Sequence, residues 1–320
     1  MRFDNKIISN LKNAKKVAIF THKRPDADCL GSASALKQVL AKLGAKCDIF
    51  CDGIINDNYL FMKHIDEVNN STLNSYDLGV AVDCSDLNRL GKYSSLFSTI
   101  DETMKIDHHK TAEDFAKLNH VEIVGSTCEI LYDLFKELGV EFDTDIAASL
   151  YAGVSSDTGC FMHDSTTANT HFVAGELLKY GFDLDKVNYL LFKRKTIGQV
   201  NLLSRALSHI RFLCENKVAI TYLTRKDFQE FGCANTETFG IVNTCVDIDI
   251  VDIGVLVSED KPGLYACSFR GKGKVDVSKI CEEFGGGGHV RAAGCNIFGT
   301  YKTVISKIEK VIEEYYARIS

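Results

Sequence analysis

The chain has 320 residues, of which 45% are hydrophobic and 25% are charged, so it is not a disordered protein. No apolar run reaches the ~20 residues that a membrane-spanning helix needs, and the N-terminal stretch lacks the apolar segment of a secretory signal. The net charge of −6 argues against a protein that binds long duplex nucleic acid, although local cations could still hold a small anion. The twelve cysteines include no CxxC pair, so we expect reduced thiols that pack in the core of a cytoplasmic protein.

The first half of the chain alternates short apolar runs with amphipathic stretches. We predict strands over residues 16–21, 46–50, 78–82 and 103–106. We predict helices over residues 30–43, 126–138, 145–154 and 166–180. Strands and helices that alternate at this spacing are typical of a parallel sheet with helices on both faces.

The second half begins with a long amphipathic segment. Residues 183–210 contain one glycine and no proline, and we predict a single helix that connects two domains. Strands are predicted after it over 218–223, 253–257 and 264–268, and a final helix over 303–319. The predicted fold class is therefore α/β, with a parallel-sheet domain over residues 1–184, a helical linker over 185–210 and a smaller mixed-sheet domain over 211–320.

Acidic residues and a histidine follow the first and third predicted strands. His22, Asp26 and Asp28 come directly after the first strand, and Asp83 comes directly after the third. Ligands of an open α/β sheet bind beyond the carboxyl ends of its strands, so these side chains are candidates for a site. The structural alternative is that Asp26 and Asp28 only cap a helix or a turn, which is the role we predict for Asp86.

Two histidines and a further aspartate complete the set. His108 and His109 follow the fourth predicted strand, where an extended chain turns neighbouring side chains in opposite directions. One histidine can therefore bind a metal while the other faces a substrate. Asp157 follows the predicted helix over 145–154 and adds another carboxylate.

These residues suit a pair of divalent metal ions. The candidate ligands supply two ring nitrogens and four carboxylates: His22, Asp26, Asp28, Asp83, His108 and Asp157. Such a set favours Mn²⁺, with Mg²⁺, Co²⁺ or Fe²⁺ as alternatives. Two metals ~3.5–4 Å apart activate water and hold a phosphoryl group for in-line displacement. The sequence therefore predicts hydrolysis of a phosphoester or a phosphoanhydride.

The second domain contains candidates for anion binding. Residues 285–294 read GGGGHVRAAG, and glycines allow backbone N–H groups to approach an anion closely, with His289 as an added donor. The alternative is a flexible turn. Arg270 follows a predicted strand and can bind a phosphate with two hydrogen bonds, whereas Phe269 beside it is expected in the core.

Six sequence blocks carry a resemblance to a known family. THKRPDAD, AVDCSD, KIDHHK and SSDTG resemble the four motifs of the DHH phosphoesterases, in the same order. SFRGKGK and GGGGHVRAAG resemble the DHH-associated C-terminal domain. The size of the chain is similar to the NrnA-like branch of nanoRNases and 3′-phosphoadenosine 5′-phosphate (pAp) phosphatases. One departure is Cys160, where many relatives carry arginine.

The resemblance implies a role for each candidate residue. One metal would be bound by His22, Asp26 and Asp83, and the other by Asp28, Asp83, His108 and Asp157. His109 would face the scissile phosphate, as an acid for the leaving group or as a stabiliser of charge. The terminal phosphate of the substrate would be held by the second domain, through Arg270, Gly287, Gly288 and His289. The active site would lie in the cleft between the domains.

The expected function is a Mn²⁺-dependent phosphodiesterase and phosphomonoesterase that acts on short oligoribonucleotides and pAp. A cyclic-di-AMP or pApA phosphodiesterase is an alternative, because it would need the same metal centre. An alternative of another class is a non-catalytic module that binds nucleotides or RNA. Partners would be short nucleotides rather than long duplexes or membranes, and the family resemblance also implies a homodimer.

Overall fold

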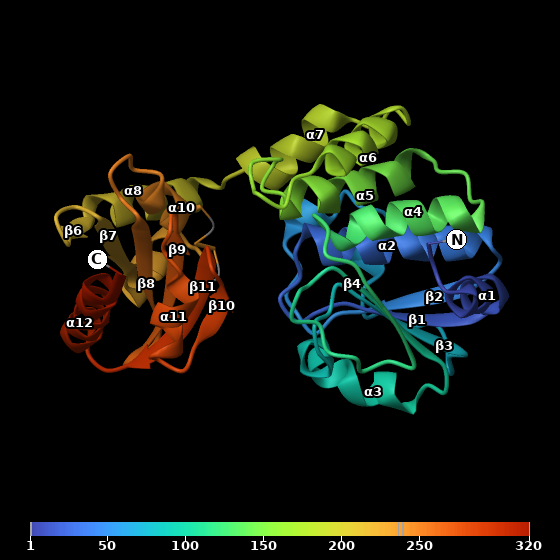
Figure 1. The fold of residues 1–320 in the computed structure, drawn as a ribbon, viewed down its shortest axis with the longest axis horizontal. Coiled ribbons are helices and arrows are strands. Elements are labelled where there is room, and N and C mark those ends of the chain that lie inside the picture. The colour runs from blue at the N-terminus through green and yellow to red at the C-terminus, as the bar shows by residue number, and fades with distance from the viewer. Residues whose placement is uncertain (1, 236, 239, 320) are drawn as a thin grey trace. The chain divides into compact units, whose positions relative to one another are not determined.

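The computed structural model describes residues 2–235, 237–238 and 240–319. The chain forms two compact units, which divide between Arg194 and Lys195 (Figure 1). Each unit contains its own sheet and its own hydrophobic core. None of the helices among the described residues combines the length and the apolar character that a membrane span requires.

The first unit is built on a parallel sheet of five strands in the order β2-β1-β3-β4-β5. The strands are β1 (Lys16–Phe20), β2 (Lys46–Phe50), β3 (Leu78–Val82), β4 (Thr103–Asp107) and β5 (Leu118–Val121). The three central strands, β1, β3 and β4, are almost wholly buried, as expected for a parallel sheet covered on both faces, and β1 and β3 are rich in apolar residues.

Helices cover both faces of this sheet (Figure 1). The helices of this unit are α1 (Asn5–Asn13), α2 (Ala27–Lys42), α3 (Ser94–Thr99), α4 (Thr127–Leu138), α5 (Thr144–Asp157), α6 (Ala168–Leu178) and α7 (Leu184–Asn188). Helices α6 and α7 pack against α5 in an outer layer. Residues of β1 alternate between the two faces. Val17 and Ile19 pack in the larger core with α2, α4 and α5, and Phe20 packs on the opposite face against Phe97 of α3.

The second unit contains a mixed sheet of six strands in the order β10-β11-β9-β8-β7-β6. The strands are β6 (Arg211–Leu213), β7 (Val218–Leu223), β8 (Ile253–Lys261), β9 (Leu264–Gly271), β10 (Gly287–His289) and β11 (Ala292–Phe298). Strands β7 and β8 are parallel, and every other neighbouring pair is antiparallel.

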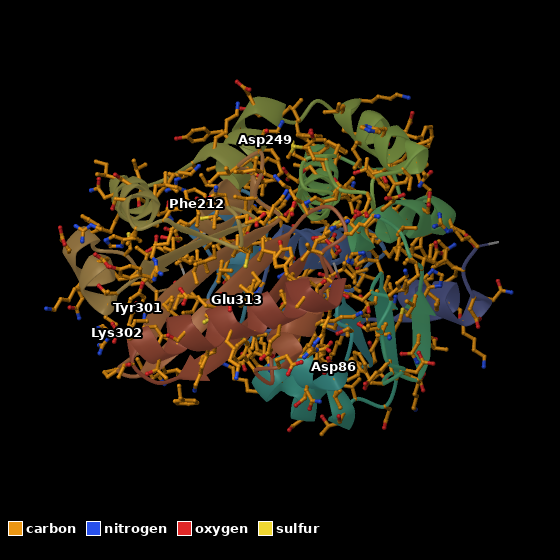
Figure 2. All side chains as sticks on the ribbon, turned by 60° about the vertical axis from the view of Figure 1, so that its left-hand side comes forward. Asp86, Phe212, Asp249, Tyr301, Lys302 and Glu313 are labelled. Carbon is orange, nitrogen blue, oxygen red and sulfur yellow. The ribbon has the colours of Figure 1, made fainter. Side chains whose placement is uncertain are left out.

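Two groups of helices cover this second sheet. The helices are α8 (Ile197–Ser208), α9 (Arg225–Phe231), α10 (Ile241–Val246), α11 (Val277–Glu282) and α12 (Tyr301–Ile319). Tyr301, labelled in Figure 2, is the first residue of α12. Helices α11 and α12 pack on one face in the main core of the unit, whereas α8, α9 and α10 share a smaller core with Leu223 and Leu256 of β7 and β8. The predicted α/β class, with one parallel and one mixed sheet, is therefore confirmed.

The prediction of one helix over residues 183–210 was wrong. The segment contains α7, a π-helical turn over Tyr189–Lys193 and then α8. Arg194 adopts an extended backbone conformation that ends the π-helix. Thr196 and Gln199 then form a reciprocal capping box that starts a new helix. A periodic apolar pattern conceals such a break, because the residues on either side keep similar spacing.

The strand predicted to end at residue 268 continues to Gly271, so Arg270 lies within β9. The glycine run is also more regular than the flexible turn considered as the alternative, because Gly287–His289 form the edge strand β10. Glycine has low β-propensity, so pairing with β11 rather than local sequence places this segment in the sheet.

Candidate metal centre

Three neighbouring strands deliver the candidate ligands to one edge of the first sheet. Strand β3 is parallel to β1 and to β4, and it lies between them. His22 lies two residues beyond the end of β1, Asp83 directly follows β3, and His108 directly follows β4. Their side chains therefore meet at the carboxyl edge, as the sequence pattern predicted.

Two helix N-termini hold the acidic residues that follow β1. Asp26 is the N-cap of α2, and its Oδ1 accepts hydrogen bonds from the backbone N–H groups of Asp28 and Cys29. Its other oxygen lies 3.4 Å from Nε2 of His22. Asp28 is fully buried and accepts hydrogen bonds from the N–H groups of Thr127 and Cys128 at the start of α4. Asp26 is thus both a cap and a member of the cluster.

Asp83 lies between the two histidines. Its Oδ2 is 3.4 Å from Nε2 of His22, and its Oδ1 is 3.4 Å from Nε2 of His108. Thr127 donates a hydrogen bond to the same Oδ1. The backbone of Asp83 has a φ of 58°, a left-handed conformation that is uncommon outside glycine and costs ~1–3 kcal/mol. The Asp83 carboxylate thus has one oxygen beside each histidine.

The orientation of His108 is the clearest indication of a cation. Its Nδ1 donates a hydrogen bond to the carbonyl of Val124 at 3.1 Å, which leaves Nε2 on the side of the cluster. Nε2 faces Oδ2 of Asp157 at 3.2 Å, Oδ1 of Asp83 at 3.4 Å and Oδ2 of Asp28 at 3.9 Å. Yet Nε2 is buried and has no hydrogen-bond partner of suitable angle among the described residues. Metal-binding histidines are held in this way, with the second nitrogen on a carbonyl.

The electrostatics of the cluster point to the same conclusion. Burial, together with Asp83 and Asp157, raises the pKa of Asp28 well above its usual range. Burial also raises the pKa of Asp157. Burial lowers the pKa of His108, but the nearby carboxylates outweigh this effect and raise that pKa to about 12. The cluster therefore stabilises a positive charge at its centre, which a divalent ion would supply in a site with these donors.

Candidate ligand atoms fall into three groups, and within each group they lie within 4.8 Å of one another. The groups are His22, Asp26, Cys29 and Asp83; Asp83, His108 and His109; and Asp28, His108 and Asp157. All six ligands predicted from the sequence, and His109, are thus brought together. Cys29 was not predicted, because all twelve cysteines were interpreted as reduced thiols that pack in the core.

Asp107 is a second residue that the sequence analysis did not single out. It is fully buried, and its Oδ1 lies 2.7 Å from Nδ1 of His109, which donates to it. The same oxygen accepts a hydrogen bond from the backbone N–H of His108. Asp107 therefore fixes the ring of His109 and its tautomer. The sequence carried one indication, a carboxylate at the very end of a buried strand.

Asp86 and Cys160 lie outside the three groups. Asp86, labelled in Figure 2, accepts a hydrogen bond from the backbone N–H of Asn88 and caps a 3₁₀ helix over Leu87–Tyr93, as expected. Cys160 is exposed and has a φ of 58°, directly after Gly159.

The predicted anion-binding residues gather at one end of the second sheet. Arg270 of β9 and His289 of β10 both pair with Ala292 of the strand between them. Arg270 donates a hydrogen bond to the carbonyl of Phe269, and burial lowers the pKa of its guanidinium. Phe269 itself is fully buried in the core, as predicted.

Glycine is required at one position of the edge strand. Gly288 has a φ of 148°, and a Cβ there would lie 2.5 Å from the carbonyl oxygen of Ala292. Gly287 and Gly288 are both exposed, so their backbone is open to solvent. The predicted anion-binding residues thus lie together in the second unit: Arg270, Gly287, Gly288 and His289. The candidate metal ligands lie in the first unit.

Comparison with known proteins gives two family matches. Residues 16–154 match the DHH family N-terminal domain, and residues 215–318 match the DHHA1 domain. The chain is 28% identical over 305 residues to the bifunctional oligoribonuclease and PAP phosphatase NrnA of Bacillus subtilis (strain 168), covering 93% of this chain and 95% of the relative.

Two solved structures have a similar fold. An exopolyphosphatase-related protein from Bacteroides fragilis has a TM-score of 0.91 at 23% identity, covering 97% of this chain and 95% of that one. RecJ from Thermus thermophilus, in complex with Mn²⁺, has a TM-score of 0.57 at 16% identity, covering 98% of this chain and 54% of that one.

Proposed function

The chain belongs to the DHH family, and on this premise we propose that it hydrolyses short oligoribonucleotides and pAp at a two-metal centre. Its DHH N-terminal domain is followed by a DHHA1 domain. The observation that carries this proposal is Nε2 of His108, buried and surrounded by three carboxylates without a hydrogen-bond partner among the described residues. The substrate class follows from the similarity to an oligoribonuclease and PAP phosphatase over nearly the whole chain.

The proposed ligands divide into two sets that share Asp83. His22, Asp26 and Asp83 form the first set, and Asp28, Asp83, His108 and Asp157 form the second. Divalent ions bound there supply positive charge to the phosphoryl group and an activated water. We propose Mn²⁺ because the donors mix nitrogen with oxygen, and because the RecJ structure of similar fold contains it.

His109 would hold and transfer the proton. Asp107 accepts from Nδ1 of His109, so the carboxylate stabilises an imidazolium and keeps the ring in one orientation. The protonated ring can then donate from Nε2 to the leaving oxygen of the nucleoside. Such a donor is needed because an alkoxide leaves poorly when it is not protonated.

The second unit would hold the terminal phosphate of the substrate. The planar guanidinium of Arg270 can form two parallel hydrogen bonds to phosphate, and the exposed backbone at Gly287 and Gly288 adds N–H donors. His289 would supply a further donor. The interdomain site expected from the sequence stays a prediction.

A panel of substrates tests this function. Purified protein would be assayed with Mn²⁺, with Mg²⁺ and with chelator on pAp, pApA, di- to pentaribonucleotides, cyclic-di-AMP and pyrophosphate. We expect metal-dependent cleavage of the short RNAs and of pAp. Activity confined to cyclic-di-AMP or pApA would replace the proposal with a signalling hydrolase. Nucleotide binding without turnover under any metal would overturn the enzyme assignment in favour of a binding module.

We also propose that the protein is cytoplasmic and forms a homodimer. All twelve cysteines are free, and a reducing cytoplasm would keep them so. The homodimer implied by the family resemblance is tested by size-exclusion chromatography with light scattering. We expect the mass of a dimer, and the mass of a monomer would overturn this proposal.

A further inference from the structure

The metal centre includes a sulfur atom that the proposed ligand sets do not use. Cys29 is the third residue of α2 and is fully buried. Its Sγ accepts a hydrogen bond from the backbone N–H of Asp26 at 3.4 Å, so the thiol turns back toward the start of the helix. There it lies within 4.8 Å of the candidate ligand atoms of His22, Asp26 and Asp83.

We propose that Cys29 is a thiolate ligand of the metal held by His22, Asp26 and Asp83, and that it makes this half of the centre selective for softer ions than the other half. The inference rests on the two-metal centre of the proposed function. On binding, the Cys29 S–H bond breaks, a sulfur–metal bond forms and the proton is released to solvent.

The two halves then differ in their donors. The first half offers one imidazole, one thiolate and two carboxylates, a four-ligand set suited to Zn²⁺, Co²⁺ or Fe²⁺. The second half offers one imidazole and three carboxylates, with Asp83 common to both, which suits Mn²⁺ or Mg²⁺. The geometry therefore points to a centre that can hold two different metals.

Other buried thiols near the site do not share this position. Cys51 is 1% exposed and also lies close to His22. Its Sγ donates to the backbone carbonyl of His22 at 3.6 Å, much as the Sγ of Cys29 donates to the carbonyl of Asp26 at 3.6 Å. Cys51 differs in that it belongs to none of the groups of candidate ligands among the described residues. It is therefore a matched control, a buried thiol in the same neighbourhood that lies outside the candidate ligand groups.

Cobalt absorption spectroscopy tests the assignment directly. The full chain would be freed of metal by chelation and titrated with Co²⁺. We expect visible bands from bound cobalt together with an intense near-ultraviolet sulfur-to-cobalt charge-transfer band. In Cys29→Ala the near-ultraviolet band should disappear while the visible bands stay, and Cys51→Ala should keep both. Cys29→Ser, with circular dichroism of each variant, guards against a change in folding.

Metal competition supplies a second readout. Loss of one ligand should weaken Zn²⁺ binding by at least about tenfold in Cys29→Ala, with a smaller change for Mn²⁺. Visible bands without a charge-transfer band in the wild type, or a charge-transfer band that persists in Cys29→Ala, would overturn the role of Cys29 alone. Absence of any cobalt band in the wild type would overturn the metal centre as well.

Discussion

The two units present charged groups in opposite ways. In the first unit, His22 and Asp83 are 2% and 1% exposed, and hydrogen bonds from helix N-termini and backbone hold the acidic side chains around them. In the second unit, Gly287, Gly288 and His289 are exposed on an edge strand, and Arg270 is the partly buried side chain among them. A compact cation needs several ligand atoms fixed in advance, whereas a phosphate on a substrate can be met by one guanidinium and open backbone.

This contrast predicts that substitutions in the two units change different properties of the enzyme. Changes in the first unit should abolish metal binding and turnover, and changes in the second should weaken substrate affinity.

Asp83→Ala should cause the greatest loss. Each of its carboxylate oxygens lies 3.4 Å from a different histidine, so one substitution would remove a ligand from both proposed metal positions. We expect turnover to fall by more than the ~10–100-fold typical of an outer partner of a metal ligand, and bound metal to drop below two ions. Steady-state kinetics and metal analysis measure this. Asp86→Ala, which removes only a helix cap, should keep both values, and an Asp83→Ala protein with normal metal content would contradict the bridging role.

Asp107→Asn should come next, with a different pattern. The carboxylate no longer stabilises the imidazolium of His109, so kcat should fall by ~10²-fold while KM and metal content change little. His109→Ala should lower kcat at least as much, and the double variant should be no worse than His109→Ala. If Asp107→Asn lowered the metal content and left kcat unchanged, the role of Asp107 would instead be to position His108, whose backbone N–H donates to it.

The sequence was most informative where strands run buried and parallel. The strands over 46–50 and 78–82 were predicted to the residue. For 78–82, an apolar run flanked by polar residues leaves few alternatives. The six ligand candidates also lie together, since the neighbouring parallel strands β1, β3 and β4 end at one edge, and their role as ligands stays a prediction.

What the sequence concealed depends on tertiary contacts. Pairing with β11 makes a strand of Gly287–His289, which has no strand propensity of its own. Cys29 resembled any other small core residue, and only folding shows its sulfur beside His22. The break between α7 and α8 is an exception with a local cause, because Thr196 caps the start of α8 and the apolar periodicity masked this signal.

Arg270→Ala tests the second unit and should leave kcat within a few-fold. Loss of a charged hydrogen-bonding partner costs ~1.5–3 kcal/mol, which predicts a KM for pAp or short RNA raised by ~10–100-fold. Arg270→Lys should recover only part of this, because an ammonium cannot reproduce the planar two-bond contact. Lys274→Ala, an exposed lysine nearby, serves as the control. A fall in kcat with unchanged KM would place Arg270 in the chemical step and break the division between the units.

The smallest effect is expected at Asp48, a buried carboxylate of the first unit that is satisfied without a metal. It accepts hydrogen bonds from Ser71, Thr72, Leu73 and Tyr76. Burial raises the pKa of Asp48, but these hydrogen bonds outweigh it and the net shift is downward. Ionised Asp48 therefore stabilises the folded state above its unfolded-state pKa of ~3.9. This contribution is lost as the pH falls through the lower pKa that Asp48 has in the folded protein.

Asp48→Asn should accordingly reduce the free energy of unfolding by ~1–3 kcal/mol at neutral pH, and this difference should narrow below about pH 4. Urea unfolding across that range, with and without chelator, measures the effect. Chelation should lower the stability of the wild type and of Asp48→Asn equally, because no ion is needed to satisfy Asp48. If chelation removed the difference in the free energy of unfolding between the wild type and Asp48→Asn, Asp48 would act through the metal centre. A full set of hydrogen bonds would then fail to separate structural carboxylates from metal ligands.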